Sequence, residues 1–164
     1  KSTLSTKIVE EFNDYNFKID SFAGKIYKIA YDLFNMKEKD RILLQNIGST
    51  MRDIDKDVWV KYILNKYNDT DNIIIDDVRY PNEVLSLRKK GYFLIKLVIS
   101  HKVQEKRIKN LYKLTSNTHL NNRTHPSETS LDDIDNDAFD IIVDVDNKDV
   151  SDIIIQINNN IAIL

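Results

Sequence analysis

A lysine and two hydroxyl residues, Lys1, Ser2 and Thr3, open the sequence in front of an amphipathic run that predicts a helix over about 3–13. They match the end of the phosphate-binding loop G-x-x-x-x-G-K-[ST], in which the lysine reaches the terminal phosphates and the hydroxyl ligates Mg²⁺. The strand and glycines of such a loop do not precede Lys1 here, so we expect Lys1 to be an internal residue of a longer natural protein. The alternative is a polar N-terminus in which Ser2 or Thr3 caps an ordinary helix.

Two acidic residues and an arginine follow the most apolar predicted strand. Three consecutive isoleucines at 73–75 predict a strand buried on both faces of a parallel sheet, and Asp76, Asp77 and Arg79 come directly after it. A carboxylate there can hold Mg²⁺ directly or through water, and an arginine offers a planar fork to a phosphate. Ligands of α/β sheets bind outside the carboxyl ends of the strands, which favours this interpretation. The alternative is that Asp77 caps the next helix and pairs with Arg79.

Helical and strand patterns alternate along the chain, which predicts an α/β fold built on a doubly wound parallel sheet. Periodicity and turn signals place strands at 17–20, 72–77, 93–99 and 140–144, and helices at 3–13, 25–34, 40–51, 55–67, 81–90, 103–114 and 150–161. The polar stretch 115–130 has no apolar periodicity, and its length suggests a functional lid rather than a linker. Since no internal repeat or domain boundary appears, we expect one domain over residues 1–164.

The composition limits the possible classes of function. Of 164 residues, 41% are hydrophobic and 30% are charged, which is ordinary for a globular domain. The net charge of −2 gives no footprint for binding a nucleic acid duplex, and the absence of cysteine excludes disulfides and thiolate metal sites. The apolar runs are too short to span a bilayer, so neither a membrane nor a duplex is an expected partner. A reducing, cytoplasmic setting is compatible with the absence of cysteine.

Two blocks of residues carry a family resemblance. The block 77–83, D-V-R-Y-P-N-E, and the block 51–60, M-R-D-I-D-K-D-V-W-V, resemble the phage and large-virus deoxynucleoside monophosphate kinase family of P-loop kinases. Three further stretches are similar to that family: Lys1, Ser2 and Thr3 at the end of its phosphate-binding loop, Phe22 and Ala23 with Lys25 after its second strand, and 125–128 (H-P-S-E) in its lid. The match runs over most of the chain in the family's order, and the D-V-R-[FY]-P-N-E block is its most distinctive part.

The resemblance implies a P-loop kinase fold of three α/β/α layers and transfer of the γ-phosphoryl group of ATP to a (deoxy)nucleoside monophosphate, with Mg²⁺. Lys1 would contact the β- and γ-phosphates, Ser2 would ligate Mg²⁺, and Thr3 would help to hold the α- or β-phosphate. In P-loop kinases a mobile lid brings basic side chains over the transferring phosphate and excludes water. Arg107 and Arg123 are the lid candidates, and the alternative for their basic segment is a solvated face.

The acceptor side of the implied site draws on the two blocks. Asp77, with Asp76, would lie at the metal and the acceptor phosphate, and Arg52 and Arg79 would clamp the acceptor monophosphate. Phosphoryl transfer needs positioning and charge neutralisation more than covalent chemistry. Lysine, arginine, Mg²⁺ and backbone donors are therefore the parts that it requires.

Three more residues are candidates for contact with the acceptor nucleotide. Trp59 is the only tryptophan, and its place on the apolar stripe of a predicted helix favours a core position over a contact with the base. Phe22 is better placed for the base because it follows a predicted strand. Lys25 either reaches a phosphate or is a solvated lysine at the start of a helix.

We therefore expect a magnesium-dependent, ATP-binding enzyme of viral deoxynucleotide metabolism, acting in the host cytoplasm, with a homodimer as one open assembly state. One alternative is a P-loop kinase of another small phosphorylated metabolite, such as phosphomevalonate. The other is a non-catalytic nucleotide-binding module. The acceptor base and the discrimination of the 2′-hydroxyl stay open.

Overall fold

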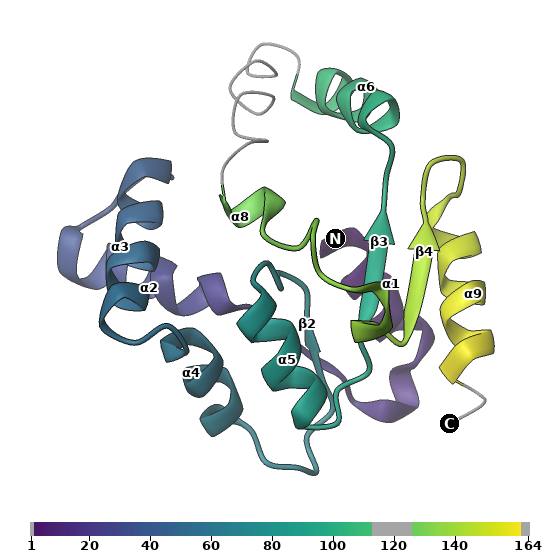
Figure 1. The fold of residues 1–164 in the computed structure, drawn as a ribbon, viewed down its shortest axis with the longest axis horizontal. Coiled ribbons are helices and arrows are strands. Elements are labelled where there is room, and N and C mark those ends of the chain that lie inside the picture. The colour runs from purple at the N-terminus through teal and green to yellow at the C-terminus, as the bar shows by residue number, and fades with distance from the viewer. Residues whose placement is uncertain (1, 113–125, 162–164) are drawn as a thin grey trace. The chain divides into compact units, whose positions relative to one another are not determined.

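The computed structural model describes residues 2–112 and 126–161, and within them the chain is mixed α/β (Figure 1). Its contacts divide it into two compact units, residues 1–78 and 79–164. In the described residues each unit holds one small parallel sheet of two strands. The expected α/β class is confirmed, whereas the continuous doubly wound sheet and the single domain stay predictions.

The first unit combines a short parallel ladder with packed helices. Its elements are α1 (Ser2–Glu11), the 3₁₀ helix η1 (Asn13–Tyr15), β1 (Lys18–Asp20), α2 (Phe22–Phe34), α3 (Arg41–Ile54), α4 (Val58–Lys66) and β2 (Ile73–Ile75). β1 runs parallel to β2, with Ile19 opposite Ile74. The helices α2, α3 and α4 pack on one another, and Ile26, Ile47 and Ile63 are buried among their apolar side chains.

Local capping explains where the helices of this unit begin and end. The hydroxyl of Ser21 accepts the N–H of Gly24 at 3.0 Å, and the carboxylate of Asp40 accepts the N–H of Leu43 at 3.0 Å. Asn35 ends α2 in the left-handed conformation, with a φ of 53°. α2 begins at Phe22 rather than at the expected position 25, because a cap determines its start and apolar periodicity does not detect caps.

The second unit also pairs two parallel strands. Its elements are α5 (Pro81–Lys89), β3 (Ile95–Val98), α6 (His101–Tyr112), α8 (Pro126–Thr129), the 3₁₀ helix η4 (Asn136–Ala138), β4 (Ile141–Asp144) and α9 (Val150–Ile161). Leu97 of β3 lies opposite Val143 of β4. Burial alternates along β4, with Val143 fully buried and Ile142 exposed. α9 contacts this strand and buries Ile157, which gives the unit its core.

The isoleucine strand differs from its prediction in one respect. β2 covers Ile73–Ile75, but all three side chains are partly exposed rather than buried on both faces. In the part of the chain that the structure describes, β2 is hydrogen-bonded to a strand on its β1 side alone. The prediction of full burial is wrong because β-branched residues report that a strand fits, while burial depends on how many elements cover it.

Glu83 provides a test of how α5 begins. Its side chain is 2% exposed, and its Oε2 accepts the backbone N–H groups of Arg79 at 2.8 Å and Tyr80 at 3.0 Å. Glu83→Ala removes this acceptor, so we expect the free energy of unfolding to fall by about 2–3 kcal/mol. Urea denaturation measures the loss, with Leu85→Ala at an exposed position of the same helix as the control. Equal stability of the two variants would contradict the capping role.

Candidate functional site

The carboxylate of Asp77 closes the N-terminus of α2. Its Oδ1 accepts the N–H of Phe22 and its Oδ2 accepts the N–H of Ala23, each at 2.8 Å. These N–H groups have no acceptor inside the helix, and the positive end of the helix dipole favours a carboxylate. Asp77 thus fixes the residues after β2 to the start of α2. The sequence offered a metal and phosphate contact, or a cap on the following helix. The structure shows a cap on α2, and the metal and phosphate contact stays a prediction.

Asp76 faces the first helix. The hydroxyl of Ser5, a residue that is 4% exposed, lies 3.5 Å from Oδ2 of Asp76. The side of α1 that carries Ser5 therefore faces the end of β2. Thr3 is exposed, and Lys1 lies outside the described residues.

The donor set at the end of β2 suits Mg²⁺ only together with a phosphate ligand. Over residues 2–112 and 126–161, no three or more histidine, aspartate or glutamate side chains form a metal-binding group. Mg²⁺ in phosphoryl-transfer sites takes one or two carboxylates and completes its shell with waters and substrate phosphates. One carboxylate, from Asp76, beside a hydroxyl-bearing side of α1 meets that requirement. These residues could hold Mg²⁺ in company with a nucleotide.

A further carboxylate at a strand end, Asp20 of β1, did not emerge from the sequence. Its Oδ2 accepts hydrogen bonds from Lys66 Nζ at 2.6 Å and from the Tyr67 hydroxyl at 2.7 Å, and its Oδ1 accepts the N–H of Ser21 at 2.7 Å. Burial raises the pKa of Asp20, but these hydrogen bonds outweigh burial and hold the pKa below its ordinary value of 3.8. The cluster ties the end of α4 to the junction of β1 and α2. The strand-end rule that selected Asp76 could have selected Asp20 too.

Arg52 and Trp59 meet at one carbonyl oxygen. Nη1 of Arg52 donates to the oxygen of Gly48 at 3.0 Å, and the indole Nε1 of Trp59 donates to the same oxygen at 3.2 Å. Arg52 is partly exposed, whereas Trp59 is 3% exposed. Protein atoms therefore already cover the ring of Trp59, and the core alternative describes its position.

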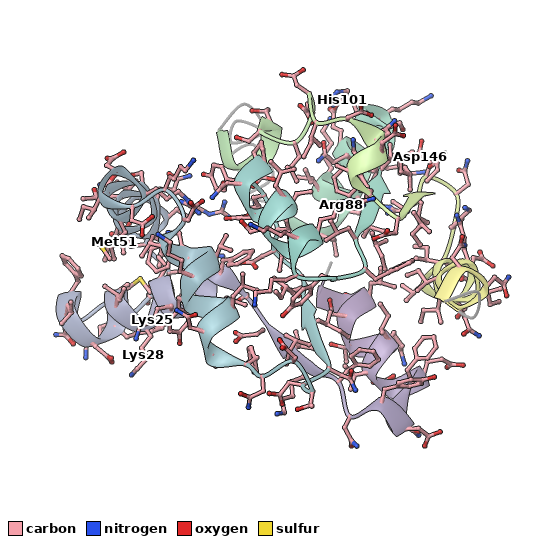
Figure 2. The ribbon with its side chains drawn as sticks, turned by 60° about the horizontal axis from the view of Figure 1, so that its bottom comes forward. Lys25, Lys28, Met51, Arg88, His101 and Asp146 are labelled. Carbon is pink, nitrogen blue, oxygen red and sulfur yellow. The ribbon has the colours of Figure 1, made fainter. Side chains whose placement is uncertain are left out.

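Phe22 and Lys25 occupy the first turns of α2. Phe22 is 2% exposed, so little of its ring is available to a base. The ammonium of Lys25, which Figure 2 labels, lies 5.3 Å from the centre of the Tyr62 ring in a cation–π contact. Lys25 is partly exposed, so it is the more accessible of the two.

Arg79 carries an ion pair in the second unit. Its guanidinium pairs with Glu128 of α8, and the two side chains are 37% and 46% exposed. Its backbone N–H is bonded to the buried Glu83. Arg79 thus combines a fixed backbone with a head group that reaches solvent. Its partner lies 49 positions away in the stretch expected to form the lid, and no spacing in the sequence reveals such a pairing.

Arg107 is anchored on the loop after β4. Its Nη2 donates to the carbonyl of Val145 at 2.7 Å and lies 3.5 Å from that of Asp146. Hydrogen bonds from Ser100 lower the pKa of the Asp146 carboxylate, and the charge of Arg107 lowers it further. These contacts join the start of α6 to the end of β4 and give Arg107 a structural partner. The other lid candidate, Arg123, lies outside the described residues, as does His125.

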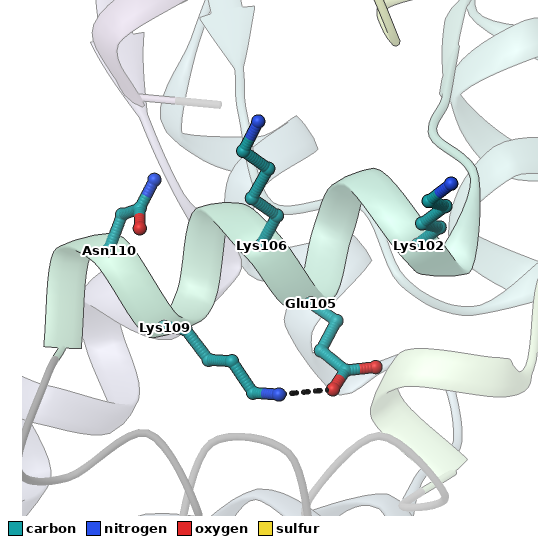
Figure 3. Close-up of a pocket in the computed structure, with 5 residues that line it drawn as sticks. All are labelled: Lys102, Glu105, Lys106, Lys109 and Asn110. Carbon is teal, nitrogen blue, oxygen red and sulfur yellow. Dashed lines mark hydrogen bonds and ion pairs between the residues drawn. The ribbon is translucent and has the colours of Figure 1, made fainter.

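A pocket on α6 is lined by several lysines, and all of its lining residues belong to that one helix. Its lining residues are Lys102, Glu105, Lys106, Lys109 and Asn110 (Figure 3). Lys109 pairs with Glu105 at 2.6 Å, while Lys102 and Lys106 extend from the other side of the helix. Ligand sites are enclosed by several elements, so this hollow fits the solvated-face alternative for the basic helix.

Comparison with known proteins identifies no relative of this chain. No protein-family model, curated protein or solved structure matches the chain. The family resemblance therefore rests on the residue blocks quoted above. Among the described helices, none is long and apolar enough to cross a membrane.

Asp77→Asn tests the cap on α2. The amide keeps one acceptor oxygen, but it turns an NH₂ group toward a backbone N–H and removes the charge that the helix end favours. We expect the free energy of unfolding to fall by about 1–3 kcal/mol. Urea denaturation measures it, and Asp32→Asn on the exposed side of α2 controls for the loss of one charge. If both variants lose the same amount, the cap contributes nothing specific.

The Asp20 cluster predicts a pH dependence. A carboxylate with a lowered folded pKa stabilises the protein above its unfolded pKa, and this contribution disappears as the pH falls through the folded pKa. The stability difference between wild type and Asp20→Asn should be about 1–3 kcal/mol at pH 7 and should shrink below about pH 4. Urea denaturation between pH 7 and pH 3 measures it, with Asp69→Asn at an exposed position as the control. A difference that stays constant over this range would rule out the ionic role of Asp20.

Proposed function

We propose that the chain is a (deoxy)nucleoside monophosphate kinase that transfers the γ-phosphoryl group of ATP to the monophosphate, with Mg²⁺. The observation that carries the proposal is the pair of contacts that Arg79 makes. Its backbone N–H donates to buried Glu83, while its guanidinium forms an exposed ion pair with Glu128. Exposed ion pairs contribute about 0–1 kcal/mol. A bidentate contact between arginine and phosphate is stronger, so a nucleotide phosphate can replace Glu128 at little cost.

Arg52 supports the proposal from the first unit. Its bond to Gly48 uses a neutral carbonyl as acceptor, and a phosphate is a stronger acceptor because it is charged. Arg52 and Arg79 belong to the two blocks that resemble the kinase family. Each of these arginines carries the positive charge that binding of an acceptor monophosphate requires.

The donor side of the proposal rests on α1 and the end of β2. Ser2 begins α1, and the N-terminus of a helix favours phosphate through its N–H groups and its dipole. Asp76 and Ser2 would hold Mg²⁺ directly or through water, and Lys1 would contact the β- and γ-phosphates. Mg²⁺, when bound, neutralises the charge that develops on the phosphates during transfer.

The proposed reaction forms no covalent bond to the protein. An oxygen of the acceptor phosphate attacks the γ-phosphorus of ATP in line, the bond from that phosphorus to the β–γ bridging oxygen breaks, and its electron pair leaves with ADP. An arginine bound to the acceptor phosphate, Arg79 in the second unit or Arg52 in the first, would orient the attacking oxygen, and Lys1 would offset charge on the donor phosphates. Asp77 would act through α2, as the residue that fixes the acceptor-side elements.

The proposal includes a doubly wound sheet, a cellular compartment and an assembly state. Both described strand pairs are parallel, as a doubly wound α/β/α sheet of the P-loop kinase type requires. Asp20 ends β1 and Asp76 follows β2, and these are the strand ends at which such sheets bind ligands. The proposed compartment is the cytoplasm, that of the host for a viral protein, and a homodimer remains a prediction.

An assay of ADP release tests the function. We expect the natural, full-length protein to turn over at least one member of a panel of nucleoside and deoxynucleoside monophosphates when ATP and Mg²⁺ are present. Turnover with phosphomevalonate alone would assign another acceptor. ATP binding without turnover of any acceptor would favour the non-catalytic module.

Arg79→Ala tests the acceptor contact. A charged hydrogen bond contributes about 1.5–3 kcal/mol, so we expect KM for the monophosphate to rise roughly tenfold or more, and KM for ATP to change less than about twofold. Arg88→Ala is the matched control, because Arg88 is an exposed arginine of α5 that donates to the carbonyl of Ala138. An equal loss of acceptor and ATP use would identify Arg79 as part of a structural ion pair.

A further inference from the structure

The carbonyl of Gly48 receives more donors than it has lone pairs. Nη1 of Arg52 and Nε1 of Trp59 both donate to it, at 3.0 Å and 3.2 Å. Gly48 and Arg52 are four positions apart in α3, so helix geometry also directs the backbone N–H of Arg52 to this oxygen. A carbonyl oxygen has two lone pairs. The guanidinium and the indole therefore compete for the one that the helix bond leaves.

The absence of a side chain at Gly48 makes this approach possible. A Cβ at Gly48 would lie 3.3 Å from Nη1 of Arg52 and 3.3 Å from Cδ1 of Ile26. Both distances are shorter than ordinary packing contacts, which lie near 3.5–4.0 Å. A larger residue at this position would displace the guanidinium from the surface of its own helix.

We propose that Gly48 and Trp59 position Arg52, and that Arg52 exchanges the Gly48 carbonyl for the phosphate of the acceptor. This inference rests on the function proposed above, because it takes the monophosphate as the ligand. A phosphate is charged and binds the guanidinium more strongly than a neutral carbonyl does. When Arg52 leaves, the indole of Trp59 takes the lone pair that the helix bond does not use. The exchange therefore strands no buried acceptor, and Trp59 lowers its cost.

Trp59 also reports on this exchange, because it is the only tryptophan in the sequence. Its emission depends on the hydrogen bond that its indole makes, and Arg52 weakens that bond by competition. In the absence of any ligand, Arg52→Ala should change the emission of Trp59. In the wild type, titration with inorganic phosphate or with the best-used monophosphate should produce a saturable change of the same sign. Unchanged emission in both experiments would overturn the shared-carbonyl model.

Trp59→Phe tests the positioning role in the full-length enzyme. Phenylalanine keeps an aromatic ring in the core but has no donor, so Arg52 is held more firmly by Gly48. Loss of one neutral hydrogen bond corresponds to roughly a three- to tenfold change, so we expect KM for the monophosphate to rise by this factor. The rate constant kcat and KM for ATP should stay within about twofold. A variant that merely loosened the core would lower kcat or ATP use as well.

Two further variants keep the test decisive. Ile63→Val removes a methyl group from a fully buried position of α4 without touching the Gly48 carbonyl, and it should leave KM for the monophosphate unchanged. Gly48→Ala leaves the Trp59 side chain in place but moves the guanidinium of Arg52 away from its position at the carbonyl. It should therefore raise that KM through misplacement of Arg52, and it tests the model even if Trp59→Phe does not fold. An equal rise in Ile63→Val, or no rise in either Gly48→Ala or Trp59→Phe, overturns the inference.

These experiments distinguish failure of the positioning model from failure of the proposed kinase function. If wild type turns over a monophosphate and Arg52→Ala loses acceptor binding, while Trp59→Phe and the fluorescence do not respond, the kinase assignment stands and the positioning model falls. If wild type neither binds nor turns over any monophosphate, both fall.

Discussion

The first unit depends on one contact between a carboxylate and a helix end. Asp77 accepts the first N–H groups of α2 with both of its oxygens. Two bonds to one rigid carboxylate fix a direction as well as a distance, so the end of β2 and the start of α2 cannot move independently. Asp20 adds a second tie, from β1 to the last turn of α4. Strand ends and helix ends that are distant in sequence thus form one rigid platform.

The arginines proposed to bind phosphate make contacts that are easier to exchange than the hydrogen bonds that hold the helix ends. Asp77 and Glu83 hold backbone N–H groups in partly or fully buried settings, where removal of the acceptor is costly. Arg52 donates to a neutral carbonyl, which binds a guanidinium less strongly than a phosphate does. Arg79 pairs with a solvent-exposed glutamate, and such pairs contribute little. A binding site must be ordered before its ligand arrives, and its side chains must still be able to exchange their partners for the ligand. Strong contacts to the backbone and weaker contacts to the head groups meet both needs.

The sequence predicted most elements because apolar spacing reports directly which face of a helix is covered. α9 is an example, since Ile153 and Ile157 repeat at helical spacing and are both buried. The start of α2 was missed because a cap and not a periodicity determines it. The burial of β2 was overestimated because three isoleucines do not specify how many elements cover a strand.

The candidate site was predictable in part. The rule that ligands bind at strand ends selected Asp76 and Arg79, but it could not supply their partners. Asp77 reaches a backbone 55 positions earlier, and Arg79 pairs with a residue 49 positions later. Such pairings follow from the path of the chain through space, and residue types and local spacing do not encode that path. The role of Gly48 was invisible for the same reason, since it depends on a tryptophan of the next helix.

The isoleucine strand has a consequence for handling the protein. Among the described residues, β2 is paired along one side only, and its three side chains are β-branched, apolar and partly exposed. An unpaired edge of this kind is a template on which any extended chain can add itself, and natural proteins protect such edges with charge, proline or a covering segment. If the protein self-associates at high concentration, this side of β2 is therefore where pairing would begin, and a segment that pairs with β2 would suppress it.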